Sequence, residues 1–209
     1  MRTNASGPFV YPQNYGFNFG TWLIWNPATG QGGDGAFYPN ARLTPTGISD
    51  GLSNTLMAAE VKTYTPYSRN HTAEQSATPP ADAAGVAAVA SSAPDKKMGA
   101  ATNDNTGHTE WPDGRVHHSG ITTTLPPNTD VQVTFNSVVY KNCDVNTMQE
   151  GKSATIKSYA AITARSYHTG LVNVALMDGS VRSVRSGITL STWRALGTRA
   201  TGEVIGNDF

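Results

Sequence analysis

The chain has 209 residues, a length that suits one domain, and only 14% of them are charged. Its 15 basic residues balance 15 acidic ones, so it lacks the basic excess of a nucleic-acid-binding protein and has no net charge to draw it to a membrane surface. The 21 glycines and 12 prolines favour a turn-rich, β-rich extracytoplasmic protein over a helical bundle.

The first third of the chain predicts short strands separated by loops. Residues 20–25, rich in aromatic and β-branched side chains, predict one strand. The glycine-rich residues 30–35 predict a loop, and no Lys-Ser/Thr pair follows to make it a phosphate-binding loop. Residues 56–65 are compatible with a strand or a short helix, and the β-forming residues 61–65 favour the strand.

The middle of the chain is less constrained. Residues 68–106 predict an insertion or mobile loop with one weak helix near residues 83–90, whose small side chains are expected to bury little. Residues 131–136 alternate apolar and polar side chains, which predicts a half-buried strand, and residues 158–165 predict another.

The strongest local signal lies near the C-terminus. Residues 171–177 and 180–185 predict two strands around the pair Asp178-Gly179, which favours a hairpin with a two-residue type I′ turn and Gly179 at positive φ. Residues 188–197 predict a capped helical turn that ends at Gly197.

One histidine-rich segment offers candidate metal ligands. His108, Glu110, Asp113, His117 and His118 lie within eleven residues, and a hairpin at Asp113-Gly114 would bring its two flanks together. The spacing matches no zinc signature, so we expect no metal and keep His108, Glu110, Asp113 and His117 only as weak candidates.

Nucleophilic catalysis has no support in the sequence. The chain contains no Gly-x-Ser-x-Gly elbow and no His-Glu-x-x-His motif, and its single cysteine, Cys143, has no base near it in sequence. We therefore expect a protein that is not an enzyme and that needs no cofactor. His168, which precedes a predicted strand, is expected to be structural and to bond the region between Asp50 and Glu60.

Four segments carry a resemblance to a known family. They are the His–nine residues–Asp-Gly pattern from His168 to Asp178, residues 48–55 with Glu60, residues 107–117 with the threonines at 122–124, and residues 193–204. Together they resemble a large paralogous family of unknown function from planctomycete-type bacteria. The matching residues, to which the family attaches no catalytic role, include His168, Asp178, Gly179, Asp50, Gly51, Asn54, Glu60 and Trp193.

The resemblance implies a pilin- or pseudopilin-like protein linked to type II secretion or type IV pilus machinery. Family members typically begin with a prepilin-type leader and a long apolar helix, which this sequence lacks. We therefore expect an α+β, β-rich fold over residues 1–209: one globular head domain with an antiparallel sheet, long loops and no N-terminal helix.

The expected function is that of a non-enzymatic structural subunit. Its partners would be other pilin-like subunits or the secretion machinery, reached through the missing helix, and not nucleic acid. This part of the protein would lie outside the cytoplasm and would not itself touch the membrane. The protein would be anchored in the membrane if the N-terminal helix is present. The alternative is an extracytoplasmic glycan- or solute-binding module, in which Tyr11, Tyr15, Trp22, Trp25 and Trp111 would stack on sugars.

Overall fold

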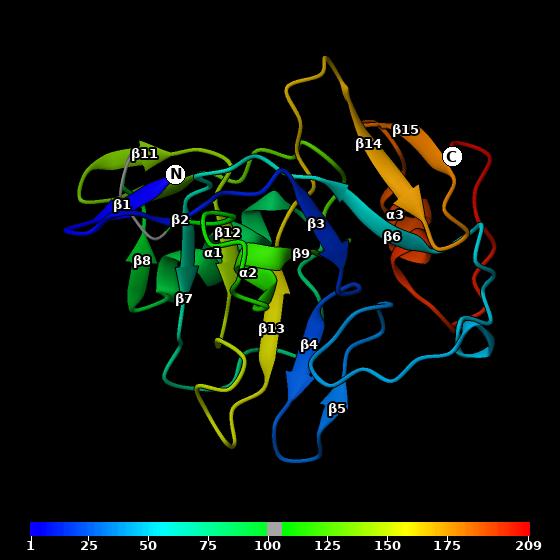
Figure 1. Ribbon diagram of the computed structural model, residues 1–209, viewed down its shortest axis with the longest axis horizontal. Coiled ribbons are helices and arrows are strands. Elements are labelled where there is room, and N and C mark those ends of the chain that lie inside the picture. Colours follow the sequence, from blue (N-terminus) through cyan, green and yellow to red (C-terminus); the bar gives the residue numbers. More distant parts are fainter. Residues whose placement is uncertain (100–105) are drawn as a thin grey trace.

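A computed structural model of the chain describes residues 1–99 and 106–209 and shows a β-rich fold with few helices (Figure 1). The predicted β-rich, mainly antiparallel class is confirmed. The strands of the N-terminal half are β1 (Arg2–Asn4), β2 (Gly7–Val10), β3 (Tyr15–Asn18), β4 (Leu23–Asn26), β5 (Gln31–Gly32), β6 (Leu56–Glu60), β7 (Tyr67–Arg69) and β8 (Asp95–Lys97). The remaining strands are β9 (Gly120–Ile121), β10 (Val133–Phe135), β11 (Val138–Tyr140), β12 (Asp144–Asn146), β13 (Ser158–Ala161), β14 (Leu171–Leu176) and β15 (Val181–Arg185).

The helices are short and lie between strands. They are α1 (Ala83–Ser92), α2 (Val116–Ser119), α3 (Leu190–Gly197) and a single 3-10 turn at Pro45–Gly47. The helical turn predicted to end at Gly197 is confirmed as α3, in which the Thr189 side chain caps the N-terminus by accepting from the Thr192 amide. No helix in the described part of the chain is long and apolar enough to cross a membrane.

Two sheets form the body of the molecule. The larger has six strands in the order β5-β4-β13-β12-β7-β8, and the smaller has five in the order β15-β14-β6-β3-β9. Pairing is antiparallel except between β7 and β12 and between β3 and β9. The chain passes from one sheet to the other between β3 and β4, and an isolated parallel bridge between Thr122 and Thr163 joins the sheets again.

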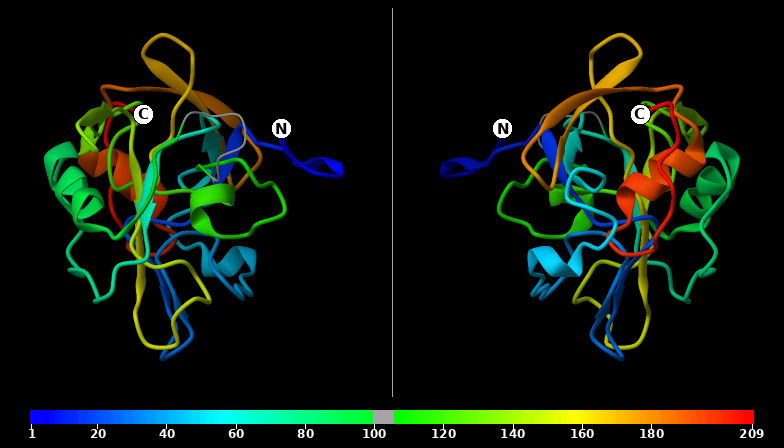
Figure 2. Two further views of the ribbon diagram at one scale, coloured as in Figure 1. Left: turned by 90° about the vertical axis from the view of Figure 1, so that its left-hand side faces the viewer. Right: turned by 90° about the vertical axis from the view of Figure 1, so that its right-hand side faces the viewer.

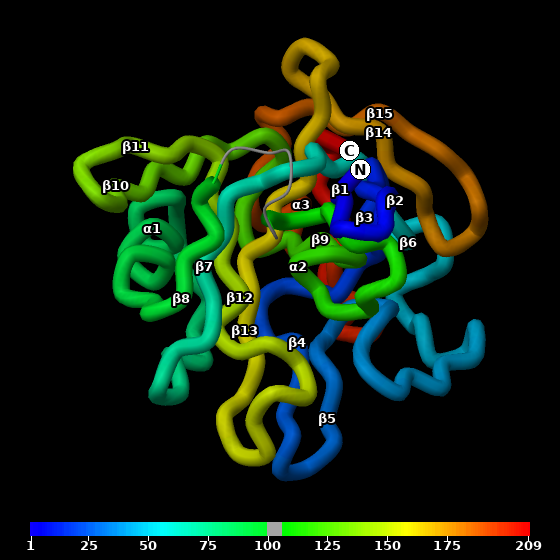
Figure 3. Tube along the Cα trace, turned by 60° about the vertical axis from the view of Figure 1, so that its left-hand side comes forward, coloured from blue at the N-terminus to red at the C-terminus, as the bar shows by residue number. Residues whose placement is uncertain are grey.

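Each sheet has its own apolar core. The five-stranded sheet packs against α3, whose Trp193 and Leu196 are completely buried among Leu56, Val174 and Leu176. The six-stranded sheet packs against α1, and the helix contacts β7, β10 and β12 (Figure 3).

The segment expected to be an insertion contributes to the larger sheet. It begins inside β7 and includes α1 and β8, and its residues 100–105 lie outside the described part. The weak helix is confirmed, with Asp82 Oδ1 accepting from the Gly85 amide at 2.8 Å. The expectation that it buries little is wrong for one face, because Val86 and Ala90 are fully buried in the second core.

Two hairpins stand apart from the sheets. The β10–β11 hairpin lies beside α1, and the β1–β2 hairpin projects from the body near the N-terminus (Figure 2). Its base is held to the body by backbone bonds, from the Trp111 amide to the Tyr11 carbonyl at 3.0 Å and from the Gln13 amide to the His108 carbonyl at 3.1 Å.

The C-terminal hairpin forms as predicted, with a different turn. β14 pairs with β15, and Gly179 has φ of +85°, which confirms the expected positive φ. The type I′ turn is wrong: Leu176 pairs with Ser180 across a three-residue loop, and the Gly179 amide donates to the Leu176 carbonyl at 2.9 Å. This is a three-residue hairpin loop, which needs a left-handed residue only at its last position.

We predict that Gly179→Ala lowers the free energy of unfolding by about 1–2 kcal/mol, because the side chain meets open space and the cost comes from the left-handed backbone alone. Gly179→Asn should cost less, since Asn tolerates this region. Gly187→Ala is the matched control, because Gly187 also faces open space and has no positive φ. Urea denaturation of the three variants measures the difference, and equal stability of the two alanine variants would exclude the turn.

Candidate functional site

The His168 end of the His–nine residues–Asp-Gly motif binds the end of a neighbouring strand. His168 Nε2 lies 3.2 Å from Glu60 Oε1 at the end of β6. Glu60 Oε2 accepts the backbone N–H of Asn173 in β14 at 2.7 Å. The prediction that His168 bonds the Asp50–Glu60 region is therefore confirmed, and Glu60 is the residue that it bonds.

The Asp178 end of the motif binds the other end of the same strand pair. The Asp178 amide donates to the Leu52 carbonyl at 3.1 Å, just before β6 begins. Its carboxylate accepts from the Ser180 hydroxyl and amide, and these bonds hold the pKa of Asp178 below its usual value. His168 and Asp178 thus lie at opposite ends of β14 and tie both ends to β6.

Asp50, Gly51 and Asn54 hold the C-terminal segment and the start of β6. Asp50 Oδ2 accepts the Thr201 amide at 2.9 Å, and Oδ1 accepts the Gly202 amide at 2.8 Å. Asn54 donates to the Asp50 carbonyl at 3.1 Å, and Gly51 has φ of +99°. The Asp50 carboxylate thus joins two distant chain segments, and Gly51 and Asn54 shape the turn that presents it, so the geometry gives these residues a framework role.

We predict that Glu60→Ala lowers the free energy of unfolding by about 1–2 kcal/mol, because the partly buried acceptor of the Asn173 amide is lost. His168→Ala should cost less than about 0.5 kcal/mol, since the ring is 55% exposed and an exposed pair contributes little. Thermal denaturation of both variants checks the order of the two effects. A larger loss for His168→Ala would contradict the framework account.

A second group of residues surrounds α2. The expected hairpin at Asp113-Gly114 is wrong, because this turn leads directly into the helix α2. His117 and His118, which both lie in α2, and His108, from the preceding loop, are each only 1% exposed.

The structure separates the four weak metal candidates. Asp113 and His117 come together with His118, and their ligand-capable atoms all lie within 4.8 Å of one another. Glu110 forms an ion pair with Arg2 instead. His108 Nδ1 donates to the His118 carbonyl at 2.8 Å, which leaves its lone pair on Nε2, an atom without a hydrogen-bond partner.

Burial keeps the three imidazoles neutral. Desolvation lowers the pKa of His108 to about 4, the pKa of His118 to about 3 and the pKa of His117 well below its usual value. At neutral pH each ring therefore carries one free lone pair. Neutral imidazole is the form in which histidine binds a metal ion.

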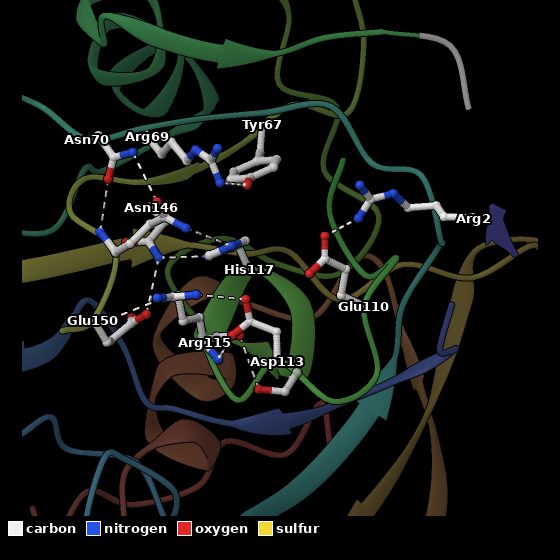
Figure 4. A network of polar contacts seen from close by, with 12 residues as sticks. Arg2, Tyr67, Arg69, Asn70, Glu110, Asp113, Arg115, His117, Asn146 and Glu150 are labelled. Atoms are coloured by element: carbon white, nitrogen blue, oxygen red, sulfur yellow. Dashed lines mark hydrogen bonds and ion pairs between the residues drawn. The ribbon is translucent and has the colours of Figure 1, made fainter. Parts of the chain in front are cut away.

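A polar network holds His117 from the side of the six-stranded sheet (Figure 4). Its ring stacks on Tyr67 of β7 with centroids 4.8 Å apart, and its Nδ1 lies 3.0 Å from the Asn146 amide nitrogen in β12. Asn146 and Ser158 also donate to the carboxylate of Glu150. Burial raises the pKa of Glu150 to about 7.

We predict a pH-dependent stability that comes from Glu150. Its pKa is raised on folding, so its contribution is complete below pH ~4.5 and is lost as the pH rises through about 7. Glu150→Gln should therefore match the native chain at pH 4 and exceed its free energy of unfolding by about 2 kcal/mol at pH 8.

The control for this variant is Glu74→Gln. Glu74 is exposed, and its hydrogen bond to Lys157 shifts its pKa in the opposite direction. Denaturation curves across this pH range measure both variants. A constant difference between Glu150→Gln and the native chain would show that folding does not shift the pKa of Glu150.

Sequence reasoning missed the partners of this cluster. Tyr67, Asn146, Gln149 and Glu150 reach it from strands and loops more than 25 residues from His117, and no local motif marks them. The sequence did point to His118, because it follows His117 directly and the two rings lie in the same short helix.

Comparison with known proteins identifies one family. The family described as "Protein of unknown function (DUF1559)" matches residues 7–190. Neither curated proteins nor solved structures give a match.

Proposed function

The chain belongs to the DUF1559 family of unknown function, and from this premise we propose that it is the globular head of a pilin- or pseudopilin-like structural subunit. Its role would be assembly and display outside the cytoplasm and not catalysis. Other pilin-like subunits or the secretion machinery would be its partners, through an apolar N-terminal helix of the kind that the resemblance implies.

This proposal rests on what the motif residues do in the structure, which is to hold the fold together. Glu60 joins His168 to β14, Asp50 holds the C-terminal segment, and Trp193 fills the core beneath the five-stranded sheet. Glu60 and Asp50 use their carboxylates to bond neighbouring segments of the same chain, and Trp193 contributes apolar packing. Such a set supports a rigid head better than a reacting centre.

An exposed aromatic flank supports contacts with other subunits. Five aromatic side chains in β2, after β2, in β3 and in the loop before α2 are exposed by 46–62%, and they are Phe9, Tyr11, Tyr15, Phe17 and Trp111. The Trp111 amide donates to the Tyr11 carbonyl, so these two residues are neighbours on the surface. Exposed aromatic side chains that lie next to each other, as these two do, favour a protein contact.

The same surface supports the alternative, an extracytoplasmic glycan- or solute-binding module. Tyr11, Tyr15 and Trp111 are more than half exposed, so their rings are accessible to a sugar. A hollow of about 280 Å³ is lined by Tyr15, Tyr167, His168 and Glu60, among others. Trp22, in contrast, is 2% exposed and donates to the Ser76 carbonyl, so it has no free ring face.

The pilin proposal predicts that assembly depends on an apolar helix. The 209-residue chain should be monomeric or weakly associated at micromolar concentration and should not turn over ester, glycoside or peptide substrates. The same chain preceded by a prepilin-type helix should insert into membranes or form filaments, because burial of apolar surface contributes about 25 cal/mol per Å². Light scattering and electron microscopy distinguish the two forms.

Two results would reject this proposal. One is filaments from the helix-free chain, and the other is none from the helix-bearing form with its secretion machinery present. Saturable glycan binding by the helix-free chain, abolished in a Tyr11→Ala/Trp111→Ala double variant that remains folded, would establish the alternative instead.

A further inference from the structure

Three side chains around α2 are arranged as a ligand set. Asp113 comes from the loop before the helix, His117 and His118 come from the helix itself, and their ligand-capable atoms lie within 4.8 Å of one another. The centre of a triangle with edges of this length lies about 2.8 Å from each corner. That distance exceeds a Zn–N bond of ~2.1 Å by about 0.7 Å, so the three groups would have to move closer together around the ion.

His118 lacks the hydrogen bonds that a buried ring needs. Both of its ring nitrogens are buried without a partner, and it is the only residue in the described part of the chain with two such side-chain atoms. Buried polar atoms almost always have a partner in folded proteins, so an exception of this kind indicates a bound ion or water.

We propose that Asp113, His117 and His118 bind one divalent transition-metal cation of the zinc class. Two imidazoles and one carboxylate are a common ligand set for such ions, and three protein ligands leave at least one position for water or for an oxygen of a ligand. The site goes beyond the proposed structural role and does not depend on it.

The surroundings of His117 distinguish its two ring nitrogens. His117 Nδ1 faces the Asn146 amide at 3.0 Å, whereas Nε2 has only the Gln149 amide nitrogen at 3.5 Å, the outer limit of a hydrogen bond. Nε2 is therefore the nitrogen that we assign to the metal. Metal binding by Nε2 places the ring proton on Nδ1, so in the metal-bound form the Asn146 side chain would turn its amide oxygen, and not its nitrogen, toward Nδ1.

Arg115 orients the carboxylate of Asp113. Its backbone amide donates to Oδ1 and its guanidinium to Oδ2, both at 2.9 Å. Each carboxylate oxygen keeps a further lone pair for a cation. In metal sites, residues that do not touch the ion commonly hold a ligating carboxylate in place by hydrogen bonds of this kind.

Neighbouring positive charges are balanced. Arg2 pairs with Glu110, Arg69 pairs with Asp95 at 2.7 Å, and Arg115 pairs with Asp113 itself. An incoming dication therefore meets no unpaired arginine among these three. The carboxylate side of the site is its entrance, because the Asp113 side chain is 17% exposed while both histidines are buried.

The test is a Zn²⁺ titration of the full 209-residue chain after treatment with a chelator, read by competition with a chromogenic chelator. Visible absorption of the Co²⁺-loaded chain reports the coordination number independently. The variants are Asp113→Asn, which keeps an acceptor for the Arg115 amide, and His118→Gln. The matched control is His71→Gln, since His71 is also buried with an unpartnered ring nitrogen but lies outside the ligand set.

We expect one Zn²⁺ per chain and a Kd raised at least tenfold in Asp113→Asn and in His118→Gln. His71→Gln should stay within twofold of the native chain, with folding of each variant confirmed by circular dichroism. Absence of Zn²⁺ and Co²⁺ binding at millimolar concentration would overturn the proposal, as would native affinity in a folded Asp113→Asn variant or an equal loss in His71→Gln. If His118→Gln does not fold, Asp113→Asn decides the outcome.

Discussion

The structure depends on a buried ion pair at the junction of the two sheets. The Arg165 guanidinium donates to Asp144 Oδ1 at 2.7 Å, and both side chains are 2% exposed. Asp144 begins β12 of the six-stranded sheet, while the Arg165 backbone amide donates to the carbonyl of Glu60, where β6 of the five-stranded sheet ends. Removal of one member of such a pair typically costs about 3–5 kcal/mol, because the other charge stays buried without compensation. The relative position of the sheets is therefore set by polar bonds that tolerate little displacement.

Further polar bonds hold the neighbouring strands and α3 to this junction. Glu60, whose carbonyl receives Arg165, uses its carboxylate to hold His168 and the start of β14. Asn18 of β3 donates to the carbonyls of Leu56 and Gly197, both at 2.9 Å, and so connects the smaller sheet to α3. His118 departs from this pattern, because both of its ring nitrogens are buried without a partner.

Local signals made part of the fold predictable. The 171–185 hairpin, α3 and the strand β6 follow from alternation, capping and turn residues within a few positions of one another. The loop length at Gly179 did not follow, because an Asp-Gly pair suits two-residue and three-residue loops alike. The strand order of the six-stranded sheet could not be predicted either. In this sheet β4 pairs with β13 and β7 with β12, and the members of each pair are more than 70 residues apart in the sequence. For the site, Asp113 and His117 were named from composition, whereas Asn146 and Glu150 come from segments whose proximity only tertiary packing determines.

The histidine cluster and the projecting hairpin share one stretch of chain. Gln13, which follows β2, donates from its backbone to the His108 carbonyl at 3.1 Å and from its side chain to the His118 carbonyl. Arg2 of β1 pairs with Glu110 in the same loop. A cation bound by Asp113, His117 and His118 would stabilise the conformation of α2 and its loop, and would therefore strengthen the anchorage of the first strands to the body.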